Sequence, residues 1–454
     1  MIHMTLNEIA QLLQLKQTDF DGYFTGLCID SRKVTPGALF VAIPGERVDG
    51  HDYIASAKAQ GAAAALVTRK MDVDLPQLVV SDIVQALGVI GKAWRDRFTI
   101  PFFAVTGSNG KTTLKNMIAA ILTAACNNQA DDVLATIGTL NNHLGLPLTL
   151  ARLGKQHKYA VIEMGMNHFG EIEYLSNLTR PDIAAITNAG PSHLEGVGDL
   201  DGVARAKAEI FCGVAKTGTV ILNRDDHYFD YWVKKAEKRH ILSFGMHANS
   251  DVRATNVTPL SLKQKISLAT PKGNIDIDLP LLGQHNVLNA LAATACCLAG
   301  NISLASIKSG LENIQPAPGR LQVHTLKNGV TVIDDTYNAN PFSLQAAIAS
   351  LSAFKGKRIF VLGDMKELGK DEAALHKAAG VDIRNAGIDQ LFTFGKLTTI
   401  TADAFGERAH HYTDQAALLT DLMQLVQPQT TIVVKGSRSM HMEIIVKGLI
   451  AATQ

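Results

Sequence analysis

The amino-acid sequence predicts an α/β protein of three domains, and three observations carry this prediction. The chain has 454 residues, which is more than one hydrophobic core usually serves. Apolar strand-like runs alternate with helix-like segments along most of the chain, a pattern typical of mainly parallel sheets covered by helices. A turn-rich stretch at 316–319 interrupts the alternation and suits a joint between domains.

The predicted first domain, residues 1–97, is a small α/β unit with short strands near 39–45 and 64–69 and a closing helix. The predicted central domain, residues 98–316, opens with a strand at 100–107. That strand runs directly into a glycine-containing loop and then a helix, the order that places backbone N–H groups at an anion site. We therefore expect a central mononucleotide-binding domain.

Further apolar strands at 158–165 and 181–190 continue the predicted parallel sheet of the central domain. The polar and apolar alternation at 252–260, 265–270 and 275–281 predicts a small accessory antiparallel sheet. The predicted C-terminal domain, residues 317–454, holds four strand–helix alternations and is expected to be a compact Rossmann-like α/β unit. Its strands are expected at 330–335, 358–364, 390–395 and 431–437.

Bulk composition excludes several classes of function. Charged residues make up 19% of the chain, hydrophobic residues 46%, and the net charge is only +1. This balance is typical of globular proteins and gives no reason to expect nucleic acid or a membrane surface as a partner. The first residues lack the features of a signal peptide, and no run is long enough to span a bilayer. Five scattered cysteines favour reduced thiols, so we expect a cytoplasmic protein.

A phosphate-binding loop is the strongest local signal in the sequence. The strict P-loop pattern requires a glycine where Val105 stands, but its functional end is intact. In such a loop Lys111 would contact the β- and γ-phosphates, and the Thr112 hydroxyl would bind Mg²⁺. The residues expected to bind ATP here are Gly107, Ser108, Asn109, Gly110, Lys111, Thr112 and Thr113.

Two further residues follow strands of the predicted central sheet. Glu163 ends the strand at 158–165, and His193 lies in the loop after the strand at 181–190. The carboxyl ends of parallel strands open onto one crevice, so both residues could complete a magnesium site beside the loop. Mg²⁺ prefers oxygen ligands, and either residue could equally be an ordinary polar loop residue.

Lys207 lies on the apolar side of a predicted helix, four residues after Val203 and three before Ile210. One interpretation is a lysine whose stem covers apolar surface while its ammonium group reaches water. The other is a buried amine with a lowered pKa that reacts with CO₂. The carbamate formed would be an anionic oxygen ligand for a second Mg²⁺.

Six motifs stand out along the chain: GSNGKTT at 107–113, EMGMNHFGEI at 163–172, GQHNVLNALAA at 283–293, DDTYNANP at 334–341, GDMKELG at 363–369 and VKGSRSMHME at 434–443. Together they resemble the Mur ligases, the amide-bond-forming enzymes of bacterial peptidoglycan synthesis, and the resemblance runs from Asp30 to Glu443. Within the family the third-domain motifs are most similar to the member that adds D-alanyl-D-alanine to UDP-N-acetylmuramoyl-tripeptide.

The resemblance implies an ATP-dependent ligase that forms an acyl phosphate and uses two Mg²⁺ ions and a carbamylated Lys207. It implies catalytic roles for Lys111, His193, Lys207 and Arg320. Beyond the loop, the implied ATP contacts are His285, Asn286, Asn289, Arg320 and Asp335. The implied metal ligands are Thr112, Glu163, His193 and Lys207. The implied substrate-binding residues are Ser31, Arg32, Arg47, His51, Asn141, Asn142, Tyr337, Asn338, Asn340, Asp364, Lys435, Ser437 and Arg438.

The same resemblance makes the first domain the UDP-muramyl site and the third domain the site of the incoming dipeptide. We expect a monomer, although the sequence carries no signal of the oligomeric state. One departure is Thr139, where the family commonly has asparagine. Another Mur ligase or a folylpolyglutamate synthase is the nearest alternative, and a nucleotide-dependent switch or transport ATPase is the alternative from another class. The third residue of the peptide stem, meso-diaminopimelate or L-lysine, stays open.

Overall fold

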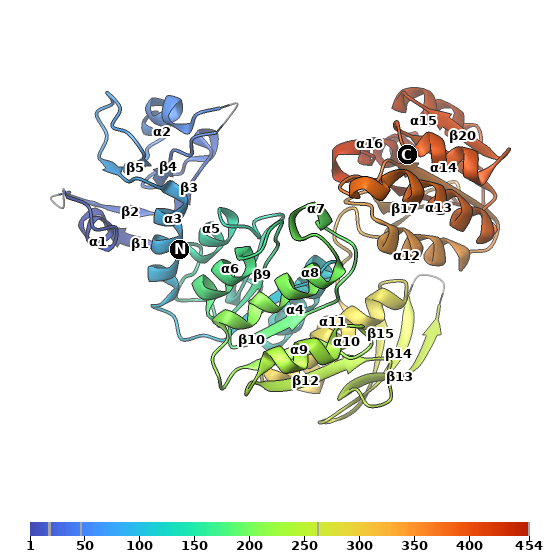
Figure 1. The fold of residues 1–454 in the computed structure, drawn as a ribbon, viewed down its shortest axis with the longest axis horizontal. Coiled ribbons are helices and arrows are strands. Elements are labelled where there is room, and N and C mark those ends of the chain that lie inside the picture. Colours follow the sequence, from blue (N-terminus) through green and yellow to red (C-terminus); the bar gives the residue numbers. More distant parts are fainter. Residues whose placement is uncertain (17–19, 46–47, 261–262, 453–454) are drawn as a thin grey trace.

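The computed structural model describes residues 1–16, 20–45, 48–260 and 263–452. The chain forms three bodies in sequence order, with the central body between the other two (Figure 1). This arrangement confirms the predicted three-domain α/β class, while the boundaries at 97 and 316 stay a prediction. Across the described ranges no helix has both the length and the apolar content needed to cross a membrane.

The N-terminal body contains, within its described residues, a two-stranded antiparallel ribbon and a four-stranded parallel sheet ordered β3-β4-β5-β6. The strands are β1 (His3–Thr5), β2 (Tyr23–Thr25), β3 (Leu27–Cys28), β4 (Leu39–Val41), β5 (Ala64–Val67) and β6 (Gln77–Val79). The helices are α1 (Leu6–Leu12), α2 (Ile54–Ala59) and α3 (Ile83–Arg95). Helix α3 leads into the central body, and its buried Ile90 and Trp94 share a core with that body.

The central body is built on a sheet with the order β15-β14-β13-β12-β11-β10-β7-β9-β8 among the described residues. Its strands are β7 (Phe102–Thr106), β8 (Val133–Ala135), β9 (Tyr159–Glu163), β10 (Ile183–Ile186), β11 (Thr219–Asn223), β12 (His240–Gly245), β13 (Val252–Pro259), β14 (Gln264–Thr270) and β15 (Gly273–Leu279). The predicted accessory antiparallel strands are present as β13–β15. Strand β13 also pairs in parallel with β12, so these strands extend the central sheet.

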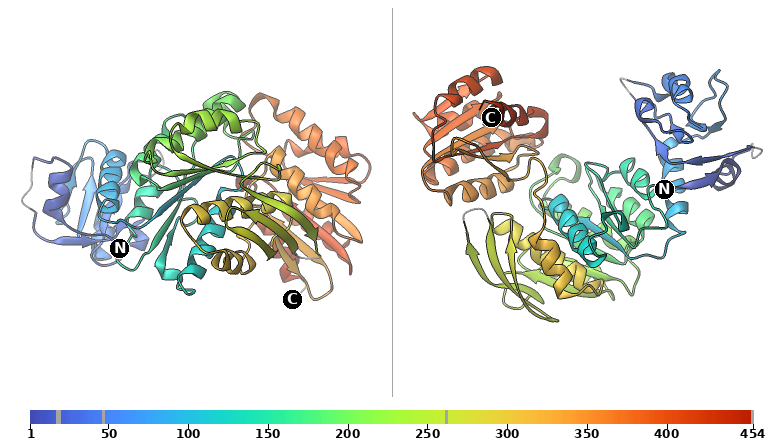
Figure 2. Two further views of the ribbon diagram at one scale, coloured as in Figure 1. Left: turned by 90° about the horizontal axis from the view of Figure 1, so that it is seen from below. Right: turned by 180° about the vertical axis from the view of Figure 1, so that it is seen from behind.

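Helices cover both faces of the central sheet, as the left view of Figure 2 shows. They are α4 (Lys111–Ala125), α5 (Gly145–Leu150), α6 (Glu171–Thr179), α7 (Leu194–Val197), α8 (Leu200–Ala208), α9 (Phe229–Ala236), α10 (Gln284–Ala299) and α11 (Leu304–Glu312). Because strand side chains alternate between faces, Phe102 and Ala104 join one core, while Phe103 and Val105 join the other. Strand β7 is buried throughout, which matches its continuous apolar sequence.

The C-terminal body has a sheet ordered β16-β17-β21-β18-β19-β20, again counting described residues. The strands are β16 (Gln322–Thr325), β17 (Thr331–Asp335), β18 (Lys357–Gly363), β19 (Gln390–Phe394), β20 (Ala409–Tyr412) and β21 (Thr430–Lys435). The helices are α12 (Pro341–Ser352), α13 (Glu372–Asn385), α14 (Thr398–Phe405), α15 (Gln415–Met423) and α16 (Glu443–Ala451). All four predicted strands are present, and the two edge strands β16 and β20 are additional.

Helix α4, which follows the phosphate loop, is supported by close backbone packing against α11. A Cβ atom added to Gly310 on α11 would lie 2.3 Å from Cα of Ile121 on α4 and 2.5 Å from its backbone nitrogen. Backbone cannot yield as a flexible side chain can, so the two helices approach closely only because residue 310 is glycine.

The substitution Gly310→Ala is therefore expected to destabilise the central body by about 1–3 kcal/mol through overpacking. The thermal unfolding midpoint should fall by several degrees in calorimetry, and Ala305→Ser on the exposed face of the same helix should leave it unchanged. An unchanged midpoint for Gly310→Ala would show that α11 shifts freely and does not fix α4.

Candidate active site

The phosphate loop connects β7 to α4 and adopts a backbone that only glycine accommodates well. Gly107 has φ +145° and Gly110 has φ +83°, both in the left-handed region. A Cβ atom on Gly107 would also lie 1.8 Å from Oγ1 of Thr187 on the loop after β10. The glycines thus let the chain turn tightly into α4, whose N-terminal N–H groups face any bound anion.

Lys111 bends back over this loop. Its Nζ donates to the carbonyl oxygen of Gly107 at 2.7 Å, and burial lowers the pKa of the ammonium group, an effect that nearby Glu163 opposes. The amine is thereby held at the mouth of the loop, where it can contact a phosphate.

Three groups meet at the hydroxyl of Thr112, the second residue of α4. Oγ1 donates to Oε1 of Glu163 at 3.2 Å and accepts a hydrogen bond from Nη2 of Arg320 at 3.2 Å. Glu163 lies at the end of β9, and Arg320 comes from the segment between α11 and β16. The sequence prediction that these residues share a site agrees with this geometry.

Glu163 has the chemistry that a Mg²⁺ ion requires. The side chain is buried, Asn141 Nδ2 donates to Oε1 at 2.9 Å, and Oε2 has no partner among the described residues. Within the described part of the chain, no group of three or more His, Cys, Asp and Glu side chains could hold a metal. A Mg²⁺ ion here would therefore take Thr112 and Glu163 as protein ligands and obtain its other oxygens from phosphate and water.

Lys207 on α8 is 0% exposed, and its Nζ has no hydrogen-bond partner in the described ranges. The interpretation of an ammonium group that reaches water is therefore wrong. Burial, and after it the charge of Lys111, lowers the pKa of Lys207 well below its ordinary value. An unpaired buried ammonium does not fit a metal site, but the neutral amine can become a carbamate that does.

His193 lies beside these groups with φ 55° at the start of α7. Burial, with the charges of Lys207 and Lys111, lowers the pKa of its imidazole to about 4, so the ring is neutral at pH 7. Its Nδ1 lies 3.8 Å from Oε2 of Glu367, which belongs to the C-terminal body. A neutral imidazole can ligate a metal.

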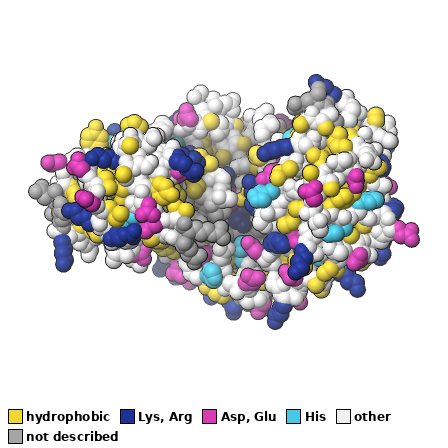
Figure 3. Space-filling model, turned by 90° about the horizontal axis from the view of Figure 1, so that it is seen from above, with side chains coloured by type: hydrophobic (Ala, Val, Ile, Leu, Met, Phe, Trp, Pro, Cys, Tyr) yellow, Lys and Arg dark blue, Asp and Glu magenta, His cyan; other side chains and the backbone are white. Residues whose placement is uncertain are grey.

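Lys111, Thr112, Glu163 and His193 line one cleft of about 230 Å³ between the central and C-terminal bodies, whereas Lys207 is not among its lining residues. Figure 3 shows the surface hollowed between the N-terminal and C-terminal bodies. The guanidinium of Arg320 stacks on the Tyr337 ring, with 3.9 Å from Cζ to the ring centroid. Among the predicted site residues, those that line the cleft are Ser108, Asn109, Gly110, Lys111, Thr112, Asn141, Glu163, His193, Arg320, Asp335, Tyr337, Asn338, Asn340 and Lys435.

A second cavity of about 110 Å³ adjoins the first and shares Asn109, Gly110, Arg320 and Asp335 with it. It has a mixed lining that suits a planar base and a ribose. Burial lowers the pKa of its His285 to about 4, so that ring is also neutral at pH 7. The remaining predicted nucleotide residues found there are Thr113, His285, Asn286 and Asn289.

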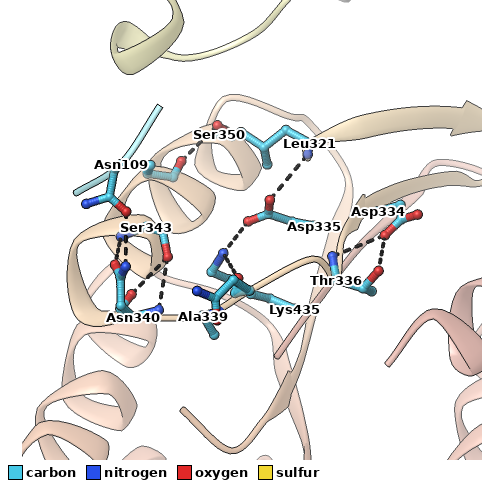
Figure 4. A network of polar contacts seen from close by, with 12 residues as sticks. Asn109, Leu321, Asp334, Asp335, Thr336, Ala339, Asn340, Ser343, Ser350 and Lys435 are labelled. Atoms are coloured by element: carbon cyan, nitrogen blue, oxygen red, sulfur yellow. Dashed lines mark hydrogen bonds and ion pairs between the residues drawn. The ribbon is translucent and has the colours of Figure 1, made fainter. Parts of the chain in front are cut away.

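Several predicted substrate residues of the C-terminal body already have internal partners. Lys435 is buried, and its Nζ donates to Oδ2 of Asp335 at 2.5 Å and to the Asn338 carbonyl at 2.9 Å (Figure 4). The Asp364 carboxylate accepts backbone N–H groups of residues 396–398 and the Nζ of Lys366.

Ser437 and Arg438 also have partners within the C-terminal body. The buried Ser437 Oγ accepts the backbone N–H of Lys366 at 2.8 Å. Arg438 lies outside both cavities, with its Nη1 3.4 Å from Oε1 of Glu443.

The described predicted residues of the first domain, Ser31, Arg32 and His51, line neither cavity. Arg32 pairs with Asp30 at 2.9 Å, and this hydrogen bond lowers the pKa of Asp30 to about 2. His51 is buried between Asp49, at 2.6 Å, and the backbone N–H of Thr68, at 3.0 Å. Both residues therefore stabilise turns of this body.

Three further residues were predicted to bind the substrate: Ser31, Asn142 and Arg47. Ser31 is buried at the start of a short 3₁₀ helix, and Asn142 Oδ1 accepts the backbone N–H of Gly145 at 2.8 Å. Arg47 lies outside the described residues. None of the three predicted roles is tested by this geometry.

Sequence reasoning missed two charged residues that line the cleft and a third that is buried close to Glu163. Lys366 and Glu367 line the cleft, directly after the predicted Asp364. Lys115 is buried one turn beyond Lys111 on α4, and its Nζ donates to the carbonyl oxygen of Thr136 at 2.7 Å. The spacing of four residues from Lys111 is the signal that could have placed Lys115 on the same helix face.

Family models match most of the chain. Residues 23–99 match the model described as Mur ligase family, catalytic domain, residues 105–297 the Mur ligase middle domain, and residues 319–438 the Mur ligase, glutamate ligase domain.

Curated relatives match over the same extent. The UDP-N-acetylmuramoyl-tripeptide–D-alanyl-D-alanine ligase of Escherichia coli (strain K12) is 43% identical over 452 residues, 99% of each chain. The enzyme of that name in Bacillus subtilis (strain 168) is 35% identical and also covers 99% of each chain.

Solved structures also match nearly the whole chain. A crystal structure of MurF from Acinetobacter baumannii superposes with a TM-score of 0.92 at 36% identity, covering 99% of each chain. The MurF ligase of Thermotoga maritima in complex with ADP gives 0.83 at 26% identity, covering 94% of this chain and 97% of that one. With three matching domain models and whole-chain relatives at this identity, the chain belongs to the Mur ligase family.

Proposed function

We propose that this protein is the ATP-dependent ligase that joins D-alanyl-D-alanine to UDP-N-acetylmuramoyl-tripeptide, giving the pentapeptide precursor of peptidoglycan. The observation that carries the proposal is the meeting of Glu163 and Arg320 at the Thr112 hydroxyl, each at 3.2 Å. It brings a metal-binding carboxylate and a cation from another body to the end of a phosphate loop. The names of the whole-chain relatives supply the two substrates.

The reaction needs ATP because a carboxylate is a poor acceptor for an amine. Phosphoryl transfer from ATP to the terminal carboxylate of the tripeptide gives an acyl phosphate, whose leaving group is phosphate. The free amine of D-alanyl-D-alanine then attacks the carbonyl carbon, and the tetrahedral intermediate releases phosphate to leave the amide.

Cations at the cleft counter the repulsion between the anionic carboxylate and the γ-phosphate. Lys111 would contact the β- and γ-phosphates, and Arg320 would approach the γ-phosphate from the C-terminal body. Because Arg320 and the loop belong to different bodies, the full set of charges exists only when the two bodies are docked. Docking also excludes water that would hydrolyse the acyl phosphate.

Two Mg²⁺ ions and a carbamylated Lys207 complete the proposed site. Bound Mg²⁺ supplies positive charge against the phosphate oxygens. Thr112 and Glu163 would hold one ion, and His193 with the Lys207 carbamate would hold the other. The unpartnered Oε2 of Glu163, the unpartnered Nζ of Lys207 and the neutral state of His193 support this assignment.

The outer domains would bind the rest of the substrates. In this proposal residues 1–97 bind the uridine diphosphate end through Ser31, Arg32 and Arg47, while the buried His51 acts by holding its turn in place. Residues 98–316 bind ATP. Residues 317–454 bind the dipeptide. Since Asp364 and Ser437 are occupied by Lys366, we expect them to act by positioning that lysine. We further propose that the protein acts in the cytoplasm as a monomer.

Phosphate release tests the proposed function directly. We expect the purified protein to release phosphate from ATP at a substantial rate only when UDP-N-acetylmuramoyl-tripeptide and D-alanyl-D-alanine are both present. Replacing the dipeptide by a diamino acid or by glutamate should abolish turnover. Rapid ATP hydrolysis without either substrate would instead indicate a switch or a transport ATPase.

The substitution Lys207→Ala should lower kcat by about 100-fold, because the oxygen ligand of the second ion is lost. Short carboxylates such as acetate should restore part of the rate, and Lys234→Ala on the exposed face of α9 should have no effect. Full activity of Lys207→Ala without added carboxylate would contradict the carbamate.

The substitution Arg320→Lys should lower kcat by about 100-fold and change the KM for ATP little. Lysine keeps the charge but lacks the planar fork that contacts Thr112 while stacking on Tyr337. Steady-state kinetics measure both constants, with Arg384→Lys as an exposed control in the same body. A raised KM with unchanged kcat would mean that Arg320 binds the ground state and the transition state equally and does not stabilise the transition state selectively.

A further inference from the structure

Asn340 connects the C-terminal body to the phosphate loop. It is the N-cap of α12, where its side-chain Oδ1 accepts the backbone N–H of Ser343 at 2.8 Å. Its Nδ2 donates to Oδ1 of Asn109 at 3.0 Å (Figure 4). One amide group therefore begins a helix in one body and reaches the nucleotide loop of another.

The cap determines which way this amide faces. A helix N-terminus offers only N–H donors, so the Asn340 oxygen must point toward Ser343. The amide nitrogen is then directed at Asn109, where it can only donate. Asn109 must in turn present its own oxygen to Asn340.

The backbone of Asn109 is already fixed within the central body. Its N–H donates to Oδ1 of Asn188 at 3.0 Å, and its carbonyl oxygen accepts from Oγ1 of Thr187 at 2.6 Å. Only the side-chain amide of Asn109 can still rotate, and its hydrogen bond with Asn340 fixes its orientation.

This orientation leaves one N–H donor group of the phosphate loop without an acceptor. Nδ2 of Asn109 is buried, has no partner among the described residues, and points away from Asn340 (Figure 4). Asn109 lines both cavities of the cleft. A buried donor without an acceptor is costly, so the site favours a ligand that brings an acceptor oxygen.

We propose that Asn340 is a positioning residue that locks the C-terminal body to the phosphate loop and turns the Asn109 amide so that its N–H groups face a nucleotide phosphate. The identity of this nucleotide as ATP rests on the proposed function. Docking of the C-terminal body and nucleotide binding then reinforce each other, because each holds Asn109 in the orientation that the other needs.

Two substitutions separate this role from helix capping. Asn340→Ser keeps an N-cap acceptor but is too short to reach Asn109, so the affinity for Mg²⁺-ADP measured by calorimetry should fall about 5-fold. Asn340→Asp is an equally good cap but cannot donate, so Asn109 must turn its oxygen toward the phosphates. We expect Asn340→Asp to lose more affinity than Asn340→Ser.

Two further measurements complete the test: a control substitution at the N-cap of another helix, and the combined substitution of Asn109 and Asn340. Asp414→Ser, at the N-cap of α15 in the same body, is the matched control and should leave ADP affinity unchanged. In an Asn109→Ala background, Asn340→Ser should have almost no further effect on affinity, since the partner is already gone.

The proposal is overturned if Asn340→Asp binds ADP like the unaltered protein, or if the Asn109 and Asn340 effects add. If Asn340→Ser proves unstable, Asn340→Asp alone decides, because its cap is intact. The binding measurements need neither acceptor substrate. If the Asn109 and Asn340 effects prove coupled but the protein shows no dipeptide-dependent phosphate release, the proposed function is wrong. The proposal for Asn340 would then still hold.

Discussion

The hydroxyl of Thr112 joins parts of the chain that lie far apart in sequence. Glu163 reaches it from the end of β9 and Arg320 from the segment before β16. Both contacts require that β7 and β9 pair in register and that α4 starts directly after the glycine loop. They also require the C-terminal body to be docked, because Arg320 is otherwise remote. A carboxylate and a guanidinium on one hydroxyl bring opposite charges to the place where a metal ion and a γ-phosphate would lie, so the position of the C-terminal body controls the charge of the site.

The sequence predicted the α/β class and the core strands because those strands contain runs of apolar residues, FFAV in β7 and IVV in β21. Strands β16 and β20 escaped prediction because edge strands need not be apolar, and QVHT and AHHY carry no periodic signal. The accessory antiparallel strands were predicted, but their connection to the central sheet was not. Alternation predicts a strand with one exposed face, but it does not say which neighbour the strand pairs with, and β13 pairs with β12.

The site was predictable where chemistry depends on local spacing and less so where it depends on tertiary partners. The loop, Glu163, His193 and Lys207 could be found from their places after strands or on a helix face. The pairing of Lys435 with Asp335 could not, since these residues are 100 positions apart. A motif shows that a residue is constrained, but only the fold shows whether the constraint comes from a ligand or from another side chain.

Three predicted site residues hold a buried polar atom that has no partner among the described residues: Oε2 of Glu163, Nζ of Lys207 and Nδ2 of Asn109. Such atoms also occur away from the cleft, for example at Tyr174 and Ser250, so they support the site only together with its geometry. An unpaired buried polar atom costs about 1–3 kcal/mol, more for a charged group. In the proposed reaction each of the three has a natural partner: a metal ion for the carboxylate, CO₂ for the amine and a phosphate oxygen for the amide. Binding of the nucleotide and its metal ion would therefore favour the docked C-terminal body, which brings Arg320 to the Thr112 hydroxyl.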